Sequence, residues 1–151
     1  MKRHFTASGV IVNPERTKML LLWHKKLGLW LQPGGHIEAD EYPHDAAMRE
    51  VKEETGLVPL LISYSFALPI SFASGSEEQM PSPMCMLAEK IPAYGSEPEH
   101  VHMDMLYLME HDECTVTSPE GREVRWMGSK ELYELNVSPA IRSIAAQLLL
   151  E

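Results

Sequence analysis

The chain is short of cysteine, of positive charge and of long apolar runs, and each shortage excludes a class of protein. Only two cysteines, Cys85 and Cys114, occur in 151 residues, and their wide spacing matches no zinc or redox motif. Against 22 Asp and Glu stand 13 Lys and Arg, and the net charge of −9 argues against binding the backbone of a nucleic acid polymer. The longest aliphatic run, residues 19–23, is far too short to span a membrane.

The N-terminal segment and the length of the chain favour a single cytoplasmic domain. Residues 1–6 carry charge, but no long apolar stretch follows them, so no signal peptide is expected. Free thiols suit a reducing compartment. A length of 151 residues and a hydrophobic content of 44% predict one domain over residues 1–151 with a sizeable core. The sequence leaves open whether this domain forms a homodimer.

Apolar periodicity and turn residues predict a chain of mixed α/β class. Helices are expected at residues 43–55 and 138–150, and mixed strands flanked by two helices indicate an α/β/α sandwich with a mixed β-sheet. The other segments are four strands (5–12, 18–23, 101–109 and 123–127), a strand-like segment (57–70), an ambiguous segment (84–91) and two loops (71–83 and 92–99).

Acidic residues are plentiful, and one segment arranges them in a regular pattern. Residues 35–57 fit G-x5-E-x7-R-E-U-x-E-E-x-G-U, with U an aliphatic residue, at every specified position. Pro43 is tolerated in the first turn of a helix, and Asp40 is a plausible cap. Gly56 is a natural C-terminal stop. The pattern therefore predicts a helix that carries the acidic residues at regular spacing.

Three carboxylates of this helix, Glu50, Glu53 and Glu54, are spaced i, i+3, i+4 and would share one face. Like charges that close repel one another unless a cation lies among them, and Mg²⁺ is commonly held by a few carboxylates plus substrate phosphates. Arg49 is placed to neutralise and orient one glutamate, for instance Glu41 or Glu53. The alternative for Arg49 is a weak, solvent-facing ion pair. We interpret Arg49 and the three glutamates as catalytic candidates.

This pattern is the Nudix box, and the chain resembles the Nudix hydrolases. The resemblance implies the Nudix fold, with a loop–helix–loop in which the Gly35 carbonyl points at a metal ion beside Glu50 and Glu54. Glu53 and Glu54 would be the main ligands, and Glu50 a further ligand or the residue that orients the water. The implied cofactor is Mg²⁺ or Mn²⁺. The implied activity is hydrolysis of a phosphoanhydride bond in a nucleoside diphosphate linked to another group.

Several histidines and one aspartate form a second candidate metal site. His100, His102 and Asp104 alternate along a predicted strand, so their side chains point to one face. His4, His36, His102 and Asp104 lie at positions resembling the His/carboxylate metal site of isopentenyl diphosphate isomerase, a member of the same fold superfamily. Imidazoles with a carboxylate suit Zn²⁺, Mn²⁺ or another transition ion. The alternative is that these histidines form hydrogen bonds in a polar cleft or face solvent.

Other functions on the same fold remain open. An isomerase of isoprenoid diphosphates would need a cysteine near the Pro-Gly-Gly turn, and this sequence has none there. A non-catalytic nucleotide-binding sensor would usually lose a glutamate of the box, and none is lost. The general base is open among Glu77, Glu78, Glu120 and Glu123. Glu120 and Glu123 could instead contact the base of the substrate.

Overall fold

The structure is a computed structural model that describes residues 1–62, 68–70 and 75–150. In chain order the elements are β1 (Lys2–Val12), β2 (Lys18–His24), β3 (Leu29–Leu31), β4 (Gly34–His36), α1 (Pro43–Thr55), β5 (Leu60–Leu61), β6 (Cys85–Ile91), β7 (His100–Glu110), β8 (Val124–Gly128), α2 (Ser129–Glu134) and α3 (Pro139–Leu148).

One mixed sheet contains all the described strands, and β1 and β7 lie at its centre. The order is β3-β2-β1-β7-β5, with β4 beside β1, β6 beside β7 and β8 beside β2. β1 and β7 run parallel over their whole length, from Lys2 opposite His100 to Val12 opposite Glu110. The other pairings are antiparallel. Because successive side chains of a strand point to opposite faces, the two central strands contribute side chains to both faces of the sheet.

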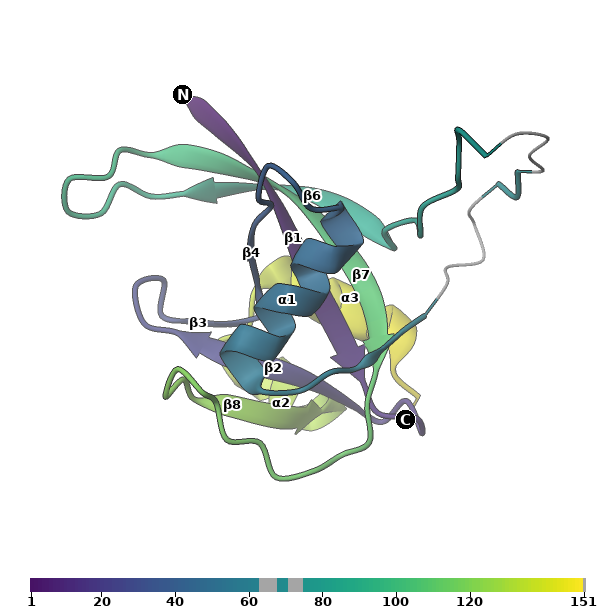
Figure 1. Ribbon diagram of the computed structural model, residues 1–151. Coiled ribbons are helices and arrows are strands. Elements are labelled where there is room, and N and C mark those ends of the chain that lie inside the picture. The colour runs from purple at the N-terminus through teal and green to yellow at the C-terminus, as the bar shows by residue number, and fades with distance from the viewer. Residues whose placement is uncertain (63–67, 71–74, 151) are drawn as a thin grey trace.

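Helices cover both faces of the sheet (Figure 1). On one face α1 buries Val51 against Ile11 of β1. On the other face α3 buries Ile141 against Val10 and Val12 of the same strand. Neighbouring strand residues point to opposite faces, so β1 contributes to both core layers. The expected α/β/α sandwich with a mixed sheet is confirmed.

The helix of the acidic segment forms over the predicted residues. Pro43 is its first residue, and Gly56 ends it with φ of 80° while its N–H donates to the Lys52 carbonyl. The expectation that Asp40 caps the helix is wrong. Tyr42 is the N-cap residue, and no side chain caps the first turn. Asp40 lies two residues too early in the chain for the cap position.

The four predicted strands are present: three have slightly longer bounds, and the fourth, β8, is shifted by one residue. The ambiguous segment 84–91 contains β6. Segment 57–70 was expected to be strand-like, but its described part holds only β5, and residues 63–67 lie outside the described residues. Residues 71–74 of the predicted loop also lie outside them. β3, β4 and α2 were not predicted. Within the described chain, none of the helices has the length and apolar character needed to cross a membrane.

Candidate active site

The two glycines after Pro33 belong to β4, which lies against the glutamates of α1. The Gly34 N–H donates to Glu54 Oε1 at 2.9 Å. A Cβ added to Gly35 would lie 2.5 Å from the carboxyl carbon of Glu50. Only glycine lets backbone and carboxylate approach this closely. Strand β4 therefore places the backbone of residues 34 and 35 beside two carboxylates of the acidic helix.

Arg49 holds the acidic residues of the helix in a defined arrangement. It donates from Nε and Nη2 to the two oxygens of Glu41 at 3.0 and 2.7 Å. Its Nη1 donates to Glu50 at 2.9 Å and to Glu53 at 3.3 Å, and its Nη2 donates to the His36 carbonyl at 3.0 Å. The hydrogen bond from Arg49 lowers the pKa of Glu41. Arg49 was expected to orient one glutamate, for instance Glu41 or Glu53, and it contacts both, in bidentate geometry with Glu41.

Glu54 is the buried carboxylate of the helix, with 5% of its surface exposed. Its Oε2 accepts a hydrogen bond from Arg122 Nη1 at 3.1 Å. Burial raises the pKa of Glu54 to about 8, against the opposing effects of the Gly34 N–H and the Arg122 charge. A carboxylate in this position is costly to ionise, and a cation beside it would favour the charged form.

The three glutamates of the helix do not converge on one point. Glu54 is bonded to Gly34 and Arg122, whereas Glu50 and Glu53 are bonded to Arg49. Among the residues that the structure describes, the three potential ligand side chains whose ligand atoms all lie within 4.8 Å are histidines. An ion that keeps several of its waters needs less convergence of carboxylates than a fully protein-bound ion.

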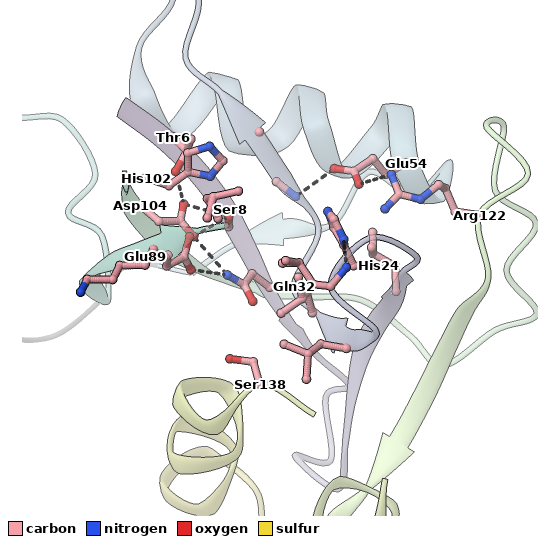
Figure 2. Close-up of a pocket in the computed structure, with 18 residues that line it drawn as sticks. Thr6, Ser8, His24, Gln32, Glu54, Glu89, His102, Asp104, Arg122 and Ser138 are labelled. Atoms are coloured by element: carbon pink, nitrogen blue, oxygen red, sulfur yellow. Dashed lines mark hydrogen bonds and ion pairs between the residues drawn. The ribbon is translucent and has the colours of Figure 1, made fainter. Parts of the chain in front are cut away.

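A cavity of about 380 Å³ opens beside Glu54 and extends across the sheet (Figure 2). Glu54 and Arg122 lie at one end, and Asp104 and Glu89 lie at the other, with Gln32 between the two groups. The apolar part of the wall comes from β2, β3, β6 and the β2–β3 turn, through Leu22, Leu27, Leu29, Leu31 and Ile91. The cavity therefore combines two charged ends with an apolar middle.

Asp104 is buried, and among the described residues it is not part of the group formed by His4, His36 and His102. It accepts hydrogen bonds from Thr6 at 3.0 Å, from Ser8 at 2.9 Å and from Gln32 at 3.1 Å. Gln32 also donates to Glu89 at 3.1 Å. Burial and the adjacent Asp104 raise the pKa of Glu89 above its ordinary value. The expectation that Asp104 joins the histidine site is therefore corrected: this carboxylate belongs to the cavity wall.

His4, His36 and His102, three of the four residues considered from the sequence for a second metal site, come together at one end of the sheet. His4 Nδ1 lies 3.1 Å from His36 Nε2, and His100 Nε2 lies 3.1 Å from His102 Nε2. Burial, together with the neighbouring histidines, lowers the pKa of His102 to about 4. The His102 imidazole is therefore neutral near neutral pH and keeps a free lone pair.

The segment before β8 faces the cavity through Arg122 rather than through its glutamates. Glu120 and Glu123 are exposed, and neither belongs to the residues that line the cavity, whereas Arg122 does. Glu120 lies 3.9 Å from Arg122. Glu77 and Glu78 are also exposed. Arg122 could not be identified from its place in the sequence, because a single arginine 68 residues after Glu54 belongs to no motif.

Comparison with known proteins gives a family match over most of the chain. The NUDIX domain model matches residues 2–148. Over 53 residues the chain is 45% identical to an RNA pyrophosphohydrolase of Marinomonas sp., covering 34% of the chain and 32% of that protein. Over 47 residues it is 45% identical to a putative 8-oxo-dGTP diphosphatase of Bacillus subtilis, covering 31% and 32%. The matched stretches thus span about a third of these two relatives.

A solved structure gives a match over nearly the full length of both chains. The crystal structure of a hydrolase of the NUDIX family from Clostridium perfringens has a TM-score of 0.76 and 27% identity, covering 98% of this chain and 97% of that one. The family model, this structural likeness and the complete acidic pattern agree with one another. The chain belongs to the NUDIX domain family.

Proposed function

We propose that this protein is a divalent-metal-dependent hydrolase of a phosphoanhydride bond in a nucleoside diphosphate linked to another group. The observation that carries the proposal is the complete box at residues 35–57, folded so that Glu54, Gly34 and Gly35 line a cavity of about 380 Å³. Relatives named pyrophosphohydrolase and diphosphatase support hydrolysis of phosphoanhydride bonds in nucleotide derivatives.

The donor atoms of the box fit a hard divalent cation. The carboxylates of Glu50, Glu53 and Glu54 and the carbonyl of Gly35 offer only oxygen, which Mg²⁺ and Mn²⁺ prefer. When bound, such a cation would offset phosphate charge and lower the pKa of a coordinated water. The net charge of −9 makes this compensation necessary for an anionic substrate.

Two arginines support the reaction in different ways. Arg49 holds Glu50 and Glu53 in place through its Nη1 contacts. Arg122 carries five N–H donors, of which the bond to Glu54 uses one. We place a phosphate oxygen of the substrate against Arg122, at the charged end of the cavity. The group beyond the diphosphate would then extend along the apolar middle toward Gln32 and Glu89.

A screen for phosphate and nucleotide release tests the proposal. The panel contains nucleotide sugars, dinucleoside polyphosphates, ADP-ribose, oxidised nucleotides and a short RNA with a 5′-triphosphate, each with Mg²⁺, with Mn²⁺ and with EDTA. We expect turnover with a metal, none in EDTA, and a nucleoside monophosphate among the separated products. The short RNA should be a poor substrate because the protein is acidic. Absence of hydrolysis across the panel with both metals would contradict the proposal and favour a sensor or an isomerase.

A further inference from the structure

Four imidazoles gather at one end of the sheet. The ring centroids of His4 and His36 lie 5.1 Å apart, those of His36 and His102 5.1 Å, those of His102 and His100 4.9 Å, and those of His100 and His4 4.9 Å. The ligand atoms of His4, His36 and His102 all lie within 4.8 Å of one another. The four rings thus surround a common centre, with three of them close enough to share one ion.

Strand register produces this convergence. His4 of β1 pairs with His102 of β7, and His36 of β4 pairs with Thr6 of β1. Thr6 lies two residues after His4, so both point to the same face of β1. Three neighbouring strands therefore project their histidines to the same side. The arrangement is set by the backbone pairing of the sheet, not by flexible loops.

Hydrogen bonding leaves one nitrogen lone pair of His100 directed into the cluster. His100 Nδ1 lies 3.0 Å from the Pro98 carbonyl and must carry a proton to bond with it. In neutral His100 the other nitrogen, Nε2, is then unprotonated and accepts a hydrogen bond from His102 Nε2–H at 3.1 Å, which leaves the lone pair of neutral His102 on Nδ1. A backbone carbonyl that holds one imidazole nitrogen in this way is the usual support of a metal-binding histidine.

We propose that His4, His36 and His102 bind one transition metal ion of the Zn²⁺ class, with His100 as a neighbouring fourth nitrogen. Zinc–nitrogen bonds of about 2.0–2.1 Å place ligand nitrogens roughly 3.4 Å apart in a tetrahedral site. The 3.1 Å between His4 Nδ1 and His36 Nε2 is already close to this separation. Imidazole is a better ligand for zinc than for magnesium, so this site and the box would take different ions.

The proposed ion lies at the rim of the cavity, because His102 also lines it (Figure 2). Three imidazoles leave one coordination position for water or for an oxygen of a ligand. Asp104 takes no part, since its oxygens accept hydrogen bonds from Thr6, Ser8 and Gln32. The proposal does not depend on the hydrolytic function, which uses the other group of ligands.

X-ray absorption on the full chain without a His tag tests the site. The protein is stripped of metal, saturated with Mg²⁺ to fill the box, and given one equivalent of Zn²⁺. We expect a zinc spectrum with three or four imidazole nitrogens at about 2.0–2.1 Å. A zinc shell made only of oxygen ligands would overturn the proposal. Bound Zn²⁺ should also raise the midpoint of thermal unfolding, because it binds the folded state.

Calorimetric titration of Zn²⁺ into variants assigns the ligands. His36→Ala should lower the affinity by at least about 100-fold, since loss of a residue that merely supports a ligand already costs roughly 10–100-fold. His36 is exposed, so the fold should persist, and an unchanged midpoint without zinc checks this. His4→Gln serves as a second variant. His111→Ala is the control, because it removes the imidazole beside the exposed Cys114 and should leave zinc binding unchanged. Equal affinity of wild type, His36→Ala and His4→Gln would contradict the proposal.

Discussion

At the scale of single residues, the carboxylates of α1 differ in their surroundings although the sequence makes them look alike. Glu54 is buried and bonded to Gly34 and Arg122, whereas half of the Glu53 side chain is exposed, at 50%. Their charges, not their packing, are what the proposed reaction needs. Amide substitutions, which keep the shape and remove the charge, therefore separate catalysis from folding.

We expect Glu53→Gln and Glu54→Gln each to lower kcat by at least about 10²-fold, the scale of a lost electrostatic catalytic group. Steady-state kinetics on a confirmed substrate measures this, and the unfolding midpoint should stay near that of the wild type. Glu15→Gln, in the exposed turn between β1 and β2, is the matched control and should keep full turnover. Near-normal kcat in both box variants would show that the proposed mechanism is wrong.

We expect Arg49→Lys to destabilise the protein although it keeps the positive charge. Lysine keeps the charge but cannot form the paired hydrogen bonds with Glu41 while also reaching Glu50 and Glu53. We expect the free energy of unfolding to fall by about 1.5–3 kcal/mol, the range for hydrogen bonds to charged groups. Urea unfolding measures it. Arg125→Lys, which alters an exposed ion pair with Glu131, is the control and should cost much less. An equal loss of unfolding free energy in both variants would show that the hydrogen bonds of the Arg49 guanidinium contribute no more than an exposed ion pair.

The candidate residues within the box could be predicted from the sequence, because a helix converts their spacing into a shared face. Arg122, Gln32 and Glu89 could not, because they meet the site only through long-range folding of separate strands and loops. The histidine site could be predicted only in part from the sequence. Strand alternation correctly put His102 on the same face as Asp104, but it could not show that the Asp104 carboxylate accepts hydrogen bonds from Thr6 and Ser8.

At the scale of elements, the site depends on how closely β4 approaches α1. A methyl group at residue 35 would collide with the Glu50 carboxylate at 2.5 Å, so Gly35→Ala should push the strand and the helix apart. We expect kcat to fall by about 10²-fold, the effect of a misplacement of about 1 Å. Kinetics with Mg²⁺ tests this. Gly128→Ala, where the nearest atom would lie 3.7 Å away, should have little effect. Normal turnover of Gly35→Ala would contradict the close-approach argument.

Local signals also explain which elements the sequence revealed. Pro43 and Gly56 mark the ends of α1 independently of the rest of the chain. β3 and β4 are three residues each, too short for any periodicity, and they form only because β2 and β1 pair with them. The strand-like segment 57–70 was predicted to be much longer than β5, because propensity could not show that only two of its described residues pair with β7.

At the scale of the whole molecule, buried carboxyl groups should make stability depend on pH. The pKa values of Glu54 and Glu89 are raised above the ordinary value of 4.5, so the folded protein binds more protons than the unfolded chain up to about pH 8. The lowered pKa values of His102 and His24 act in the opposite direction, but only below about 6.5. Between about pH 6.5 and 8, therefore, the free energy of unfolding should fall as the pH rises.

Urea unfolding in EDTA across this pH range measures the effect. Glu89→Gln removes one of the two groups and should make the free energy of unfolding decrease less steeply with pH. Glu78→Gln, which changes an exposed residue, should leave the slope as in the wild type. A free energy of unfolding that rises with pH in the wild-type protein over this range would contradict the prediction.

The long parallel pairing of β1 with β7 has a consequence for folding of the protein during its synthesis on the ribosome. Thr6 and Asp104 are register partners, although 98 residues separate them in the chain. At a synthesis rate of about 5–20 residues per second, β7 is synthesised roughly 5–20 s after β1. During that interval one edge of an apolar strand has no native neighbour, so the nascent chain should depend on chaperones until β7 leaves the exit tunnel.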